Sequence, residues 1–127
     1  MRIPFFQRER DLTKWVETTL GWPRVVFAGN TLSTNGTPDR LFWAPRTPGV
    51  WCELKRFDGV LSPLQVRWAR DAHRASVGLR YLVLRGGAAR GPWAVEAEGW
   101  QGEHRGGLPW EVDDARKALR GFLLEFS

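Results

Sequence analysis

The chain has 127 residues, of which 43% are hydrophobic, enough for one domain with a core and too many for a disordered chain. Its 19 basic residues outnumber the 14 acidic ones, and the net charge of +5 favours a polyanionic partner such as nucleic acid. One cysteine, Cys52, and two histidines exclude an internal disulfide and a Cys- or His-based metal cluster, so any bound metal must be held by carboxylates.

The first half of the chain is predicted to form one helix and three strands. Residues 8–20 have the spacing of an amphipathic helix, and Gly21 follows it. Short β-branched and aromatic runs predict strands at 24–27, 39–43 and 50–56, the last two joined as a hairpin by turn residues. The apolar stripe of the helix comprises Leu12, Trp15, Val16 and Leu20.

The second half begins with a helix whose start is clearly marked. Ser62 is a good N-cap, Pro63 suits the first helical position, and Gln65 falls at the third. We expect the helix to run to Val77 and to end at Gly78. Its predicted apolar stripe consists of Leu64, Trp68, Ala72 and Ala75.

The rest of the chain is predicted to contain two strands and a helix. Residues 79–84 form a nearly continuous apolar run, typical of a buried strand, and 93–97 are expected to return as an edge strand. The Gly-rich segment 99–109 is expected to be irregular. Either Asp113 or Asp114 should cap a last helix. The resulting order, αβββαβ followed by one strand and one helix, predicts an α/β sheet covered by helices.

Three polar residues in the predicted hairpin suggest chemistry. Glu53 and Lys55 are two apart in a strand, so both should point to the same face, away from Val50, Cys52 and Leu54. Hairpin pairing should bring Asp39, at the start of the neighbouring strand, close to Glu53. Two converging carboxylates suit Mg²⁺ or Mn²⁺, and Lys55 would stand beside them.

Simpler interpretations of the same residues remain open. Asp39 could be a turn residue after Pro38, and Glu53 with Lys55 could form a charge ladder on an exposed face. The pair Ser62 and Gln65 has the spacing of a capping box, so Gln65 could serve the helix, the site, or both.

The blocks Gly36-Thr37-Pro38-Asp39 and Glu53-Leu54-Lys55, followed by Gln65 at a helix start, resemble the PD-(D/E)XK nuclease superfamily, and most closely its VRR-NUC branch. The resemblance covers about residues 36–85 and extends loosely to the first helix. It implies a restriction-endonuclease-like αβββαβ core with a mixed sheet flanked by helices, here with an extra C-terminal strand and helix. Because the small stand-alone members resemble Holliday-junction resolvases, it also implies a phage- or mobile-element-encoded nuclease.

The resemblance also implies roles for individual residues. Asp39, Glu53 and the backbone carbonyl of Leu54 would be metal ligands, Lys55 would be catalytic, and Gln65 would support the site. The family often adds a glutamate from the first helix, for which Glu9 is the first candidate and Glu17 the second.

The expected function is that of a Mg²⁺- or Mn²⁺-dependent endonuclease that cuts branched DNA as a homodimer. We expect it in the cytoplasm of a bacterial or phage-infected cell, with no membrane contact and no small-molecule cofactor. The alternative is a catalytically silent DNA-binding or adaptor module with the same fold. A stripe of arginines on the middle helix could track phosphates, contact a second subunit, or simply be solvated. The candidate DNA-binding residues are Arg40, Arg56, Arg67, Arg70 and Arg74.

Overall fold

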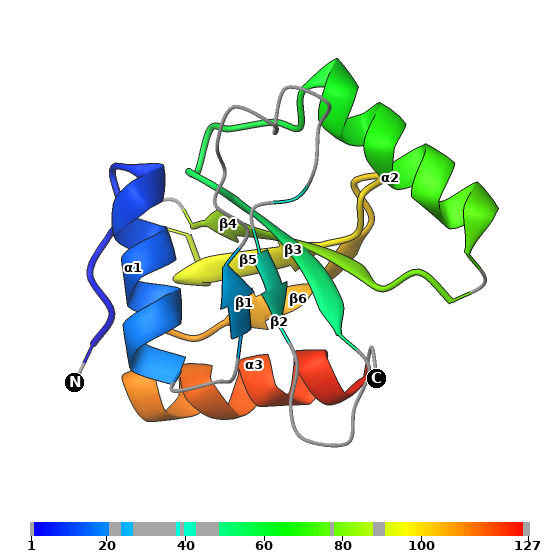
Figure 1. The fold of residues 1–127 in the computed structure, drawn as a ribbon. Helices are drawn as coiled ribbons and strands as arrows, with labels where there is room; N and C mark the ends of the chain where they lie inside the picture. Colours follow the sequence, from blue (N-terminus) through cyan, green and yellow to red (C-terminus); the bar gives the residue numbers. More distant parts are fainter. Residues whose placement is uncertain are drawn as a thin grey trace.

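The computed structural model describes residues 2–20, 24–26, 38, 40–42, 49–76, 78–87 and 91–125. These residues form an α/β fold in which one six-stranded mixed sheet lies between helices (Figure 1). No helix among them is long and apolar enough to cross a membrane. The elements are α1 (Glu9–Leu20), β1 (Arg24–Val26), β2 (Arg40–Phe42), β3 (Val50–Lys55), α2 (Pro63–Ala75), β4 (Tyr81–Gly86), β5 (Val95–Glu98), β6 (His104–Leu108) and α3 (Val112–Glu125).

The sheet follows chain order from β1 to β6. β2 and β3 form the predicted antiparallel hairpin, with Arg40 opposite Cys52 and Phe42 opposite Val50. β3 and β4 are parallel, because α2 carries the chain across the sheet between them. The remaining neighbours are antiparallel, so the sheet is mixed, as expected.

The two faces of the sheet carry separate cores. On one face, Val50, Cys52 and Leu54 of β3 are buried among residues of α1 and α3. On the other, Trp51 of β3 packs with residues of α2 and β4. The predicted alternation along β3 is therefore confirmed, and Glu53 and Lys55 belong to the α2 face.

The C-terminal part of the sheet differs from the prediction. Residues 99–109 are not irregular throughout, because His104–Leu108 forms β6. Consequently β5 is an inner strand rather than the predicted edge strand, and the core is followed by two strands instead of one. The sequence pattern did not predict β6, because two of its five residues are glycines and none is β-branched. The glycines leave room for aromatic rings: Phe122 lies over Gly106, and Trp93 lies over Gly107.

Two predicted helix features were also wrong. α2 ends at Ala75, with Ser76 as its C-cap, and Val77 lies outside the described residues. α3 begins at Val112, so Asp113 and Asp114 lie in its first turn rather than at its cap. Acidic side chains there still interact favourably with the helix dipole.

The close contact between β6 and Trp93 predicts a large cost for one added methyl group. Alanine at Gly107 would place its Cβ inside the indole ring of Trp93, so we expect Gly107→Ala to lower the free energy of unfolding by about 1–3 kcal/mol. Gly121 in α3 is the matched control, because a Cβ there meets nothing within 4 Å. Gly121→Ala should instead stabilise the protein by up to about 1 kcal/mol. Urea unfolding of both variants would measure the difference, and equal effects would contradict this placement of β6.

Candidate functional site

Glu53 occupies an unusual position for a carboxylate. It lies on β3 facing α2 and is 1% exposed, and among the described residues it is the one buried side chain of the types Asp, Glu, Lys and Arg. Both oxygens share this burial, since Oε2 is also shielded from solvent. An exposed charge ladder is therefore excluded for this residue. Burying a carboxylate is costly unless polar groups compensate for the lost water, so its surroundings determine whether the strand is stable.

Gln65 supplies one such group. Its side-chain amide nitrogen, Nε2, donates a hydrogen bond of 2.9 Å to Oε1 of Glu53. The bond joins the first turn of α2 to the middle of the sheet, across 12 positions in the chain. It fixes one oxygen of the carboxylate and thereby orients the whole group.

The same glutamine also caps its helix. Its Oε1 accepts a 2.8 Å hydrogen bond from the backbone nitrogen of Ser62, and its own backbone nitrogen donates to Oγ of Ser62 at 3.2 Å. These two bonds form a complete capping box. Gln65 therefore caps its helix and also contacts Glu53, one of the predicted site residues. The capping bond holds the side-chain oxygen of Gln65 toward Ser62, so the side-chain nitrogen points to Glu53 and donates to it.

Lys55 follows on the same strand face. It is half-buried at the end of β3, opposite Arg85 of β4 in the parallel register. Arg85 forms an ion pair with Glu98 of β5, in which each side chain is 17% exposed. Lys55 has no ion pair with any described residue. It is therefore a positive charge on the same face of β3 as Glu53 that no described residue engages in an ion pair.

The other predicted ligands are only partly described. Asp39 lies outside the described residues, and Arg40 is described in its backbone alone. Leu54 directs its side chain into the opposite core, as a ligand acting through its carbonyl would. No three His, Cys, Asp or Glu side chains gather within the described part of the chain. That finding leaves open the predicted carboxylate pair, of which Asp39 is one member.

The two helix glutamates differ in their placement on α1. Glu9 precedes the fully buried Leu12 and Val16 by three and seven residues, so it shares their sheet-facing stripe. Glu17 lies off this stripe, about 12 Å further along the helix. Figure 1 shows the N-terminal end of α1 near the end of β3. Because α1 covers the sheet face opposite that of Glu53, a glutamate of α1 would have to reach the site past the end of β3, and Glu9 rather than Glu17 is at the end of α1 that lies there.

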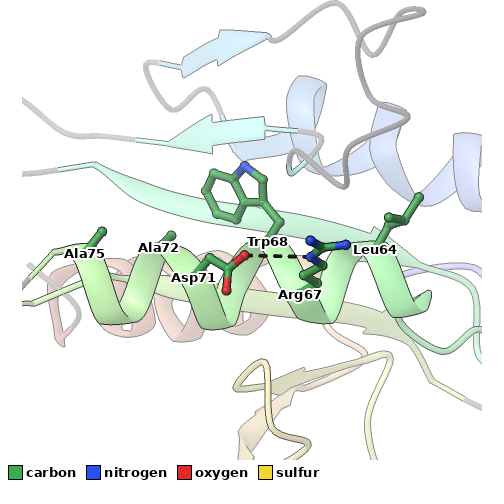
Figure 2. Close-up of a pocket in the computed structure, with 6 residues that line it drawn as sticks. All are labelled: Leu64, Arg67, Trp68, Asp71, Ala72 and Ala75. Atoms are coloured by element: carbon green, nitrogen blue, oxygen red, sulfur yellow. Dashed lines mark ion pairs between the residues drawn. The ribbon is translucent and has the colours of Figure 1, made fainter.

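The middle helix contacts the sheet differently from its predicted apolar stripe. Ala69 is its buried residue, with Gln65 one turn before it, whereas Leu64 is 45% exposed. The predicted stripe instead lines a cavity of about 500 Å³ beside the helix (Figure 2). Trp68 forms the inner part of this wall and packs edge-on against Trp51, with ring centroids 5.2 Å apart.

The arginines of α2 lie on its outer surface. Arg67 and Arg70 are exposed and both approach Asp71, with N–O distances of 3.9 and 3.4 Å (the first pair is drawn in Figure 2). Arg74 is exposed one turn later. Exposed ion pairs of this kind add little stability, so a charged partner could replace Asp71 as the partner of these arginines at little cost. It points away from Glu53, because Gln65 and Ala69 occupy the opposite side of the helix.

One anchor near the site was missed by the sequence interpretation. Arg85 donates from Nε to the backbone carbonyl of Gly59 at 2.8 Å, which ties β4 to the turn that follows Lys55. A Cβ on Gly59 would lie 3.3 Å from that of Lys55, so the turn also packs on the lysine stem. The sequence signal for this anchor was Arg85 at the end of the apolar run 79–84. Its partners could not be predicted, because Gly59 and Glu98 are distant from it in sequence.

The double role of Gln65 can be separated by mutation. Gln65→Glu keeps an oxygen for the capping box but directs a second carboxylate at Glu53, and two such groups in hydrogen-bond contact cannot both be ionised without repulsion. We expect it to lower the free energy of unfolding by at least about 2 kcal/mol. Ser62→Ala, which removes only the cap, should cost about 1 kcal/mol. Chemical denaturation of both variants at neutral pH would compare them, and an equal loss would mean that the contact with Glu53 contributes nothing.

Comparisons of this chain with protein-family models, with curated proteins and with solved structures found no match. A functional proposal therefore depends on the geometry around Glu53, Lys55 and Gln65.

Proposed function

We propose that the chain is a divalent-metal-dependent endonuclease that hydrolyses phosphodiester bonds in branched DNA. The observation that carries the proposal is the buried carboxylate of Glu53, oriented by Gln65 and followed on the same face by Lys55. A purely structural strand has no need for a charge at a position where an apolar residue would pack without cost. Buried and oriented carboxyl groups of this kind are concentrated at functional sites.

The donor set suits a hard divalent cation. Asp39, Glu53 and the carbonyl of Leu54 would hold Mg²⁺ or Mn²⁺, and Glu9 is the candidate for a further ligand. The register of the hairpin supports Asp39 and Glu53 as a pair of ligands. Arg40 lies opposite Cys52, and in antiparallel strands the next pair in this register is Asp39 with Glu53. When bound, the ion would supply Lewis-acid chemistry at the phosphate and acidify water.

The protein's own groups would complete the reaction. Gln65 would hold Oε1 of Glu53, so that the carboxylate keeps one orientation while substrate enters. Lys55 would stabilise the negative charge that develops on the phosphate as the phosphorus–oxygen bond breaks. The ion pair of Arg85 with Glu98 keeps the neighbouring guanidinium engaged elsewhere, which leaves this task to the lysine.

The substrate and assembly are inferred from different properties. The net charge of +5 and the exposed arginines of α2 suit a DNA backbone. The resemblance to junction resolvases supports branched DNA. Symmetric cleavage of a four-way junction requires two sites, so we propose a two-fold homodimer.

A cleavage assay with one lysine variant would test the proposal. With Mg²⁺ or Mn²⁺, the wild type should cut a labelled four-way junction in preference to a flap, a single strand or a plain duplex, and EDTA should abolish cutting. Lys55→Ala should lower the cleavage rate at least about 100-fold while leaving DNA binding near the wild-type level. The reason is that the lysine would stabilise the charge that develops on the phosphate in the transition state, not the bound substrate.

Lys117 provides the matched control, since it is an exposed lysine on α3, away from the site. Lys117→Ala should cleave like the wild type, and Asp39→Asn should be as inactive as Lys55→Ala. Full activity of Asp39→Asn would place the metal elsewhere. Tight DNA binding by the wild type, with no cutting under either ion, would favour the alternative of a DNA-binding adaptor module.

A further inference from the structure

The turn that follows Lys55 presents an aromatic ring to solvent. The backbone nitrogen of Gly59 donates to the carbonyl of Arg56 at 2.9 Å, which closes a tight turn with Phe57 at its tip. Phe57 is 38% exposed although it is large and apolar. The same turn packs on the stem of Lys55, because a Cβ on Gly59 would lie 3.3 Å from that of Lys55.

The ring is held from two sides. Phe5 packs against it with centroids 5.3 Å apart and planes tilted by 47°. The guanidinium carbon of Arg56 lies 5.0 Å from the ring centroid of Phe57, and Arg56 itself pairs with Asp58. These contacts restrict the ring while leaving part of its surface open. An exposed aromatic ring beside an arginine is a typical platform for stacking a nucleobase.

The turn is anchored to the sheet. Arg85 bonds the carbonyl of Gly59, and Glu98 holds Arg85 in turn, so a half-buried ion pair fixes the base of the turn. Gly86, next to Arg85, lies close to Phe6 and to the backbone of Phe57. The turn that carries Phe57 is therefore held against the sheet, next to the strand that carries Lys55.

The surroundings favour nucleic acid as the occupant. Residues 55–70 contain four basic side chains and one acidic one. Among the described residues, the exposed large hydrophobic side chains all fall in this same segment. The arginine beside them is Arg56, which pairs with Asp58, whereas Arg67 and Arg70 lie on the outer surface of α2. A segment with both apolar and basic side chains fits a partner with stacking faces and a negative backbone. The exposed apolar residues are Phe57, Val60, Leu64 and Val66.

We infer that Phe57 stacks on a base that is exposed at the branch point of the DNA, next to the phosphate that is cleaved. Bases inside a duplex are already stacked on both faces, whereas a base at a branch point can be splayed onto a protein ring. Phe57 would thus select branched DNA over a plain duplex. This inference rests on the proposed function, since it names the substrate feature recognised at that site.

Binding measurements can test the stacking role separately from cleavage. The probes are a fluorescein-labelled forked duplex with two unpaired arms and a fully paired duplex of the same length, titrated by anisotropy with Ca²⁺ in place of Mg²⁺. Phe57→Leu keeps apolar bulk against Phe5 but removes the aromatic face, and we expect it to weaken fork binding about tenfold. Binding to the paired duplex should change less than twofold.

Two further variants make the result specific. Phe57→Trp should retain fork binding, because it offers a larger ring. Val60→Ala should also retain it, although Val60 is 75% exposed in the same segment. Thermal melts of each variant would establish that it folds.

Each outcome has a defined meaning. Equal loss on both probes, or no loss with Phe57→Leu, would overturn the stacking role, as would a change confined to the oligomeric state. If the wild type never cleaves but prefers forks through Phe57, the stacking role holds and the nuclease proposal fails. If the wild type cleaves and Phe57→Leu binds and cuts forks normally, the nuclease proposal holds and the stacking role fails.

Discussion

A buried carboxylate on the central sheet imposes the main constraint on this structure. The side chain of Glu53 on β3 faces α2 and is shielded from water, so a polar group of the protein has to replace the lost hydrogen bonds to water. Gln65 does so, and its other amide atom completes the cap that begins the helix. The cap of α2 and the orientation of the carboxylate therefore involve the same side chain.

This constraint explains where sequence patterns predicted the fold and where they did not. The period-two alternation of β3 and the cap at Ser62 were local signals, and the structure confirms both. The apolar stripe of α2 was misleading because a polar partner for Glu53 had to face the sheet. The helix is therefore rotated so that Gln65 and Ala69 lie inward and Leu64 lies at the surface. Hydrophobic periodicity assumes that the inner face is wholly apolar, whereas here Gln65 shares it with Ala69 and Trp68.

Other features could not be found in sequence because they depend on distant partners. Strand β6 exists because aromatic side chains from elsewhere lie over its glycines, and a glycine-rich stretch alone indicates a loop. For the candidate site, the common face of Glu53 and Lys55 was predictable from strand geometry. The ion pair of Arg85 with Glu98 was not, since strand pairing across the sheet determines it.

The same partners link the two ends of the proposed site. Arg85 is opposite Lys55 in the parallel register and also bonds the turn that carries Phe57. A charged pair that is only 17% exposed exchanges little with water, so the turn and the lysine share one rigid support. Rigid support matters for phosphodiester chemistry, because displacement of a reacting group by about 1 Å can cost about 100-fold in rate. A ring that stacks a base on this support would position the adjoining phosphate relative to Lys55, so recognition of a branch and alignment for cleavage would be one event.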